Sequence, residues 1–260
     1  MTRLGKLALT LWLAGVAACG SDRGRPRTPR PAPAPPTAQG AGSDDAGSAD
    51  APALAPADRI IDAGRRALGV SDDDEATLTI VADASVVGPH GEEFRTSIRS
   101  SSDGRARMEQ TPGGFVAGVG REGGWMIDPE TADVVELGST LLFLRGHELH
   151  MLALDPLSRL SNPRLTTGER LGETFAVAMD LPSGDSLILY YATADTLPAG
   201  LRVTWIEPNV HVQWTDWVER GGLRFFTRAV FRQGEDFFRY TYDDVGPREL
   251  PDSVFEPPGP

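Results

Sequence analysis

Cysteine is nearly absent from this sequence of 260 residues, because Cys19 is the only one. An exported chain with a single cysteine can form no internal disulfide, so its stability must come from packing. No cysteine follows residue 19, which excludes thiol catalysis in the remainder of the chain.

Recognisable catalytic motifs are also lacking. The sequence contains neither a Gly-x-Ser-x-Gly elbow nor a phosphate-binding loop. His147 and His150 have a spacing that could direct both imidazoles at one metal, but the His-Glu-x-x-His spacing of zinc proteases is missing, and the only further ligand nearby is Asp155. We therefore predict no metal site, no cofactor and no enzymatic activity, and we interpret residues 147–150 as a solvated helix face.

Positive charge is in short supply. The chain has 25 Lys and Arg against 37 Asp and Glu, and its net charge is −12. Without Arg3 and Lys6 the net charge is −14, and the four arginines and four acids of residues 19–56 cancel, so the negative excess lies after residue 56. An acidic surface disfavours nucleic acid as a partner and disfavours electrostatic docking on anionic lipid.

Long apolar runs are missing as well. The run from Leu7 to Ala18 is well short of the ~20 residues that span a bilayer as a helix. Arg3 and Lys6 precede it and small residues end it, which is the pattern of a signal peptide over residues 1–18. The simpler alternative is a secretory signal with an incidental cysteine.

The end of this segment, Val16-Ala17-Ala18-Cys19-Gly20, resembles the lipobox of bacterial lipoproteins. This resemblance implies that Cys19 is acylated after cleavage and that its lipid attaches the chain to a membrane. Gly20 after the cysteine implies an outer-membrane lipoprotein of the bacterial cell envelope, facing the periplasm.

Residues 19–56 consist mainly of Pro, Ala, Gly, Ser and Asp. Such a segment cannot bury enough apolar surface to offset its loss of conformational entropy, so we predict a disordered tether. Residues 57–260 have a length suited to one compact domain.

The domain is predicted to be mainly β (α+β). It opens with a helix over Arg59–Leu68, for which Asp58 would be the N-cap and Gly69 the stop. Apolar and polar residues then alternate in more than ten short segments, and so many strands favour a curled antiparallel sheet. The apolar, non-alternating residues 140–153 predict an inserted helix. The predicted strands are 78–86, 94–99, 105–109, 114–119, 124–128, 133–137, 165–171, 174–181, 186–193, 201–207, 210–218, 223–232 and 236–243.

Three segments of the C-terminal half resemble turns of the LolA/LolB-like superfamily of lipoprotein-sorting proteins. They are Leu189–Val203 with its Leu197-Pro198 turn, Val212–Leu223, and Leu250–Pro258 with its terminal Phe255. The resemblance implies a half-barrel with an N-terminal helix and a mid-chain helical plug on its concave face, which would hold acyl chains.

A lipid site requires a water-excluding concavity lined by large apolar groups. The candidate lipid-binding residues are Leu142, Phe143, Val203, Trp205, Val212, Trp214 and Phe225. The expected partners are the membrane, through Cys19, and acyl chains of lipids or lipoproteins. The alternative is a filled core, which would make the protein a non-catalytic envelope scaffold.

Overall fold

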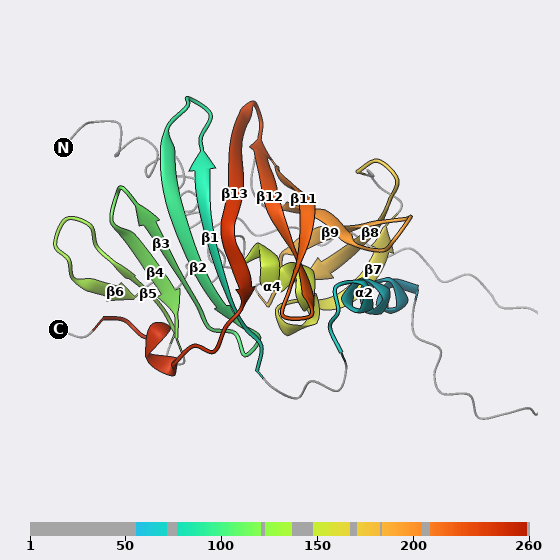
Figure 1. The fold of residues 1–260 in the computed structure, drawn as a ribbon, viewed down its shortest axis with the longest axis horizontal. Coiled ribbons are helices and arrows are strands. Elements are labelled where there is room, and N and C mark those ends of the chain that lie inside the picture. Colours follow the sequence, from blue (N-terminus) through green and yellow to red (C-terminus); the bar gives the residue numbers. More distant parts are fainter. Residues whose placement is uncertain are drawn as a thin grey trace, which may run out of the picture.

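The computed structural model describes residues 56–71, 77–120, 123–136, 148–166, 171–182, 184–203 and 209–258. These residues form one antiparallel sheet of 13 strands with two α-helices (Figure 1). The helices are α2 (Pro56–Ala67) and α4 (Leu149–Leu154), with short 3₁₀ turns η2 (Pro156–Ser158) and η3 (Asp252–Val254). The strands are β1 (Thr79–Val87), β2 (Glu93–Ser101), β3 (Ala106–Thr111), β4 (Phe115–Val119), β5 (Gly124–Ile127), β6 (Val134–Glu136), β7 (Ser161–Thr166), β8 (Thr174–Asp180), β9 (Ser186–Ala192), β10 (Pro198–Val203), β11 (Val210–Arg220), β12 (Leu223–Gln233) and β13 (Asp236–Pro247).

The order of the strands explains the position of the plug. The sheet runs β6-β5-β4-β3-β2-β1-β13-β12-β11-β10-β9-β8-β7, so the first and last strands are neighbours in its centre. The chain therefore moves outward from β1 to the edge strand β6, and it resumes at the opposite edge with β7. The connection between these two edges has to cross the sheet, and α4 belongs to that connection. Figure 1 shows α4 against the middle of the sheet.

The face that α4 covers, called the inner face below, carries the main core. On β1 the inward residues Ala82, Ala84 and Val86 are buried, and Ile98 on β2 and Met108 on β3 continue the same face. All six residues of α4 are buried. The sheet is curled but not closed, because β6 and β7 have partners on one side only. The prediction of a curled antiparallel half-barrel is confirmed.

Helix α2 confirms the predicted N-terminal helix and its stop. Gly69 has a φ of 84°, and the amides of Gly69 and Val70 donate to the carbonyls of Arg66 and Arg65, which closes the helix in a Schellman motif. The prediction that Asp58 is the N-cap is wrong, since α2 begins at Pro56 and Asp58 lies in its first turn. A negative side chain there still complements the positive end of the helix dipole.

A single glycine lets α2 approach the sheet. A Cβ atom at Gly64 would lie 2.6 Å from Cε1 of Tyr191 on β9, so only glycine permits this contact. Beyond the helix, the amide of Arg224 donates to the carbonyl of Leu68 at 2.9 Å. These contacts join α2 to β9 and its C-terminal end to β12, and α2 also packs against the edge strand β7.

The C-terminal segment covers the opposite, outer face at the other end of the sheet. Phe255 is fully buried, and its carbonyl accepts a hydrogen bond from Nε1 of Trp125 at 3.0 Å. The guanidinium of Arg105 lies 4.9 Å from the centre of the Phe255 ring and donates to Asp252. The terminal motif is therefore a structural clasp on β3 and β5.

Two local predictions need correction. Strand β7 begins at Ser161, four positions before the predicted start, although Pro163 lies within it; as an edge strand β7 tolerates a residue without an amide donor. Strict alternation also fails on β12, where Phe225 and Phe226 are both buried. Asp216 on the neighbouring strand has a φ of 59°, and the regular pairing of β11 and β12 is interrupted there.

Candidate functional site

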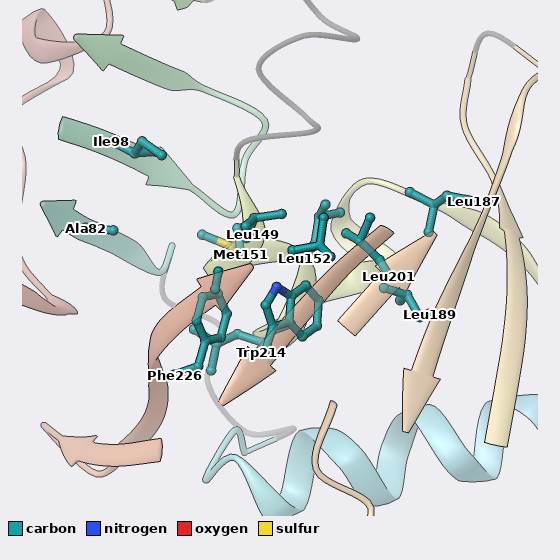
Figure 2. Close-up of a cluster of buried hydrophobic side chains, with 14 of the residues drawn as sticks. Ala82, Ile98, Leu149, Met151, Leu152, Leu187, Leu189, Leu201, Trp214 and Phe226 are labelled. Carbon is teal, nitrogen blue, oxygen red and sulfur yellow. The ribbon is translucent and has the colours of Figure 1, made fainter. Parts of the chain in front are cut away.

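The candidate site is the inner face of the sheet together with the plug α4. Leu149, Met151, Leu152 and Leu154 are apolar and buried, so α4 is apolar around most of its circumference. A helix of this kind is stable only when it is enclosed. Figure 2 shows Leu149, Met151 and Leu152 between Ala82 and Ile98 on one side and Leu187, Leu189 and Leu201 on the other.

Little space remains beneath the plug. The recess between α4 and strands β1 and β2 has no enclosed space large enough for a water molecule. It is lined by Ile80, Ala82, Ile98, Ser100, Glu148, Leu149 and His150. Sites for small molecules enclose roughly 300–1,000 Å³. A ligand as large as an acyl chain thus needs room that α4 occupies in this conformation.

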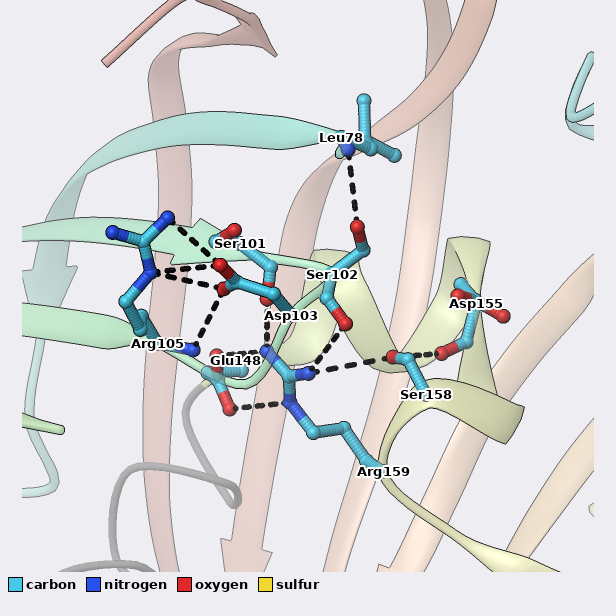
Figure 3. A network of polar contacts seen from close by, with 9 residues as sticks. All are labelled: Leu78, Ser101, Ser102, Asp103, Arg105, Glu148, Asp155, Ser158 and Arg159. Atoms are coloured by element: carbon cyan, nitrogen blue, oxygen red, sulfur yellow. Dashed lines mark hydrogen bonds and ion pairs between the residues drawn. The ribbon is translucent and has the colours of Figure 1, made fainter. Parts of the chain in front are cut away.

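A buried ion pair fastens the plug to the sheet. Nη2 of Arg159 lies 3.0 Å from Oε1 of Glu148, and the two side chains are 1% and 2% exposed. The guanidinium also donates to the carbonyls of Ser101 and Ser102 at the end of β2. Figure 3 shows Arg159 between Glu148 and this turn. Every contact of this arginine joins the segment around α4 to itself or to β2, so we call it the Arg159 clamp.

His150 forms the second attachment of the plug. Its ring is stacked on that of Phe226 with centroids 3.9 Å apart, and its Nε2 donates to the carbonyl of Phe226 at 2.9 Å. Burial lowers the pKa of His150 to about 4, although the hydrogen bond opposes this shift. The imidazole is therefore neutral at pH 7, with its proton on Nε2 because a carbonyl can only accept.

Aromatic rings continue this contact across β11, β12 and β13. The ring of Trp214 is stacked on Phe226 at 5.1 Å, and Tyr242 meets Phe226 edge-on at 5.5 Å. The indole Nε1 of Trp214 and the hydroxyl of Tyr242 are buried and have no hydrogen-bond partner among the described residues. Buried donors are normally satisfied, so two in one cluster call for an explanation.

The structure brings four of the predicted site residues together. Val203, Val212, Trp214 and Phe225 are all buried in the core cluster that contains α4. Leu142, Phe143, Trp205 and Cys19 lie outside the described residues. Their predicted roles, like the lipid-binding role of the other four, stay predictions.

The interpretation of residues 147–150 as a solvated helix face is wrong where the structure describes it. Glu148 and His150 are each 3% exposed, because the clamp and the Phe226 stack draw them inward. His147 lies outside the described residues, and the described part of the chain contains no group of three metal-ligating side chains. The overlooked signal was composition: polar residues inside an otherwise apolar segment are enclosed with it and need partners.

An open, curled antiparallel sheet whose inner face carries helices defines the class of fold, which is LolA-like. The structure is similar to that of the LolA superfamily protein NE2245 from Nitrosomonas europaea, with 12% sequence identity, a TM-score of 0.54, and coverage of 78% of this chain and 99% of that chain. It is also similar to a DUF1329 family protein from Desulfovibrio piger, with 12% identity, a TM-score of 0.46, and coverage of 78% and 98%. At 12% identity the first likeness establishes the fold alone.

The sequence matches no protein-family model and no curated protein. Neither helix in the described part of the chain is long and apolar enough to cross a membrane.

Proposed function

We propose that this protein is a non-enzymatic lipid- or lipoprotein-binding protein of the bacterial cell envelope, which holds acyl chains on its inner face. The observation that carries the proposal is the cover of that face. Among the described residues, the centre of an apolar, curled sheet is covered by α4, which is fastened to it by the Arg159 clamp and by His150. A scaffold with a permanent core has no need of a separately fastened cover.

Loading is proposed to occur by exchange. The recess beneath α4 has no room even for a water molecule, so an acyl chain would take the place of the α4 side chains. Burial contributes about 0.8 kcal/mol per methylene, so a chain of ~16 carbons gains about 12 kcal/mol. Exposing the large apolar side chains of α4 to water costs roughly 6–12 kcal/mol of burial free energy in total. Gain and loss are of similar size, which permits both loading and release.

The two unpaired donors suggest where a polar part of the ligand would lie. Nε1 of Trp214 and the hydroxyl of Tyr242 are both available to an acceptor, and both flank Phe226. An ester or carboxylate oxygen of a lipid accepts hydrogen bonds and would satisfy these groups. Its acyl chain would then run along the face formed by Ala82, Ala84 and Ile98.

Attachment to the membrane is the second part of the proposal. We propose that acylated Cys19 is linked by residues 19–56 to the domain over residues 57–260 and holds it at the outer membrane, on the periplasmic side. A flexible chain of this length has a root-mean-square span of roughly 30 Å, so the domain would stay within reach of the bilayer.

Native mass spectrometry of the acylated full-length chain, purified from its own membrane, tests the proposal. A bound phospholipid or fatty acid in addition to the lipid on Cys19 is the expected result. If instead the protein carries no such ligand and binds no added fatty acid, the inner face is a filled core and the protein is a scaffold.

A further inference from the structure

Exposed apolar side chains gather at one end of the molecule. Of the six large hydrophobic residues that are exposed in the described part of the chain, Leu157, Leu165 and Phe175 belong to η2, β7 and β8. Isolated exposed hydrophobic residues are common, but a group at one place indicates an interaction site. Val134, which is equally exposed, lies on β6 at the opposite edge of the sheet.

Leu157, Leu165 and Phe175 all belong to elements that lie next to helix α2. It packs against β7, and its Arg65 lies 3.9 Å from Asp155, directly before η2. Phe175 pairs across the sheet with Tyr191, on which Gly64 of α2 rests. Leu165 pairs with Val177, which places it on the same face of the sheet as Phe175. We call α2 together with Leu157, Leu165 and Phe175 the α2 end.

The outward side of α2 carries two arginines, with Asp62 between them. Arg59 and Arg66 are seven positions apart, so they lie on one side of the helix, and both are exposed. Neither makes an ion pair with a described residue, whereas Arg95, Arg164, Arg228 and Arg248 on the sheet all pair with aspartates. Arg220, Arg224, Arg232 and Arg239 on the sheet are exposed and likewise make no ion pair with a described residue, so Arg59 and Arg66 are distinguished by their place beside the apolar group and not by lacking partners.

The residues that precede the described part of the chain join it at this end. Helix α2 starts at Pro56, and the 55 residues before it include Cys19. Any membrane attachment in that segment pulls on the molecule at α2. In Figure 1, α2 lies beside β7, at the opposite end of the sheet from β6.

We propose that the α2 end is the surface by which the domain rests on an anionic phospholipid bilayer. Arg59 and Arg66 contact lipid phosphates, while Leu157, Leu165 and Phe175 enter the interface between headgroups and acyl chains. The acidic remainder of the domain is repelled by the same bilayer, so charge selects this orientation. The inference rests on the proposed membrane attachment and adds to it the face that meets the lipid.

A pair of matched labelling sites tests the inference. Leu165→Cys and Val134→Cys place one thiol on each edge strand, at residues that are 47% and 45% exposed. Because acylation consumes Cys19, the introduced thiol is the only one open to a nitrobenzoxadiazole label. The acylated full-length chain is reconstituted in phosphatidylcholine vesicles containing phosphatidylglycerol and a lipid-borne doxyl quencher. The label at residue 165 is expected to be quenched several-fold more than that at residue 134.

Two controls separate the possible causes. Arg59→Glu combined with Arg66→Glu, or high salt, should remove the difference between the sites, whereas excess unlabelled fatty acid should leave it intact. Equal quenching at both sites overturns the inference, as does a difference that fatty acid abolishes, which reports loading of the inner face. A change at residue 165 that grows with protein concentration without vesicles identifies a second copy as the occupant and also overturns it.

The attachment itself is checked on the same samples. The intact mass shows whether each molecule carries acyl groups on Cys19 and one label. Two labels per molecule mean that the proposed lipidation has failed, and the orientation experiment is then repeated with a chain held to the vesicles through a chelating lipid and an N-terminal histidine tag.

Discussion

His150 and Phe226 are joined twice, by rings stacked 3.9 Å apart and by a hydrogen bond of 2.9 Å from the imidazole Nε2 to the carbonyl. The first belongs to the plug and the second to β12. The docking of α4 on the sheet therefore depends on a neutral histidine. This dependence links the closed form of the inner face to pH.

The stability of the protein should fall on mild acidification because of His150. Its pKa is about 4 in the folded state against an ordinary value of 6.5, so the unfolded state takes up the proton first. The contribution of the neutral imidazole is complete above pH 6.5 and is lost as the pH falls towards 4. Between pH 7 and pH 5 this amounts to about 2 kcal/mol. Urea unfolding at both pH values measures it.

His150→Gln is the control for that prediction. The variant keeps a hydrogen-bond donor but has no group that titrates in this range. Its loss of stability between pH 7 and pH 5 should be smaller than that of the wild type by the histidine contribution. Equal losses would show that other groups cause the pH dependence.

Breaking the Arg159 clamp should be costly. Glu148→Gln leaves a buried guanidinium without its counter-ion, and removal of one partner of a buried pair typically costs about 3–5 kcal/mol. Asp243→Asn, which breaks the exposed pair with Arg95, should change the unfolding free energy by no more than about 1 kcal/mol. Chemical denaturation of the two variants compares them directly.

The same substitution bears on loading. If acyl chains replace α4, weakening the empty closed form favours the loaded one. Glu148→Gln should therefore bind a fluorescent fatty acid more tightly than the wild type, despite its lower stability. Weaker binding would mean that the clamp supports the site instead of closing it.

The C-terminal clasp should be essential for stability. Phe255→Ala removes a fully buried ring that lies against the Arg105 guanidinium, and such substitutions cost about 3–5 kcal/mol. Phe237→Ala is the matched control, because that ring is 37% exposed on β13. Comparable losses in thermal unfolding would show that the segment is not clasped in solution.

Most of the sheet could be predicted from the sequence, because alternation of apolar and polar residues directly reports a strand with one buried face. Alternation fails at Phe225 and Phe226, which lie opposite the part of β11 where Asp216 has a positive φ. The residue pattern does not predict this backbone conformation. The strand order is also hidden from local patterns. Strand β1 pairs with β13, although the two strands are far apart in the chain. This pairing puts β6 and β7 at opposite edges of the sheet, so the segment that connects them, which contains α4, has to cross the inner face.

The site was only partly predictable for a related reason. Four core residues could be predicted because each is apolar and lies on the apolar side of an alternating segment. They are Val203, Val212, Trp214 and Phe225. The partner of Glu148 is Arg159, eleven residues further on and beyond Pro156, at a spacing that matches no motif. The burial of His150 could not be predicted because its partner is the backbone carbonyl of Phe226. Every residue has such a carbonyl, so no sequence pattern identifies the partner.

Lipidation at Cys19 is tested by labelling cells with radioactive palmitate. We expect label on the wild-type protein and none on Cys19→Ser, since no other cysteine exists. Retention of label by the variant would refute this attachment. The variant should also leave the membrane fraction.

Quenching of tryptophan by a doxyl-labelled fatty acid tests the central claim most directly. Trp214 and Trp125 are 3% and 4% exposed but lie on the inner and outer faces respectively. Because the chain has five tryptophans, the comparison uses variants in which Trp214 or Trp125 is the only one left, the others being replaced by Phe. The account predicts saturable quenching when only Trp214 remains and little quenching when only Trp125 remains. Quenching that does not saturate, or that is equal in the two variants, would contradict the claim that acyl chains bind on the inner face.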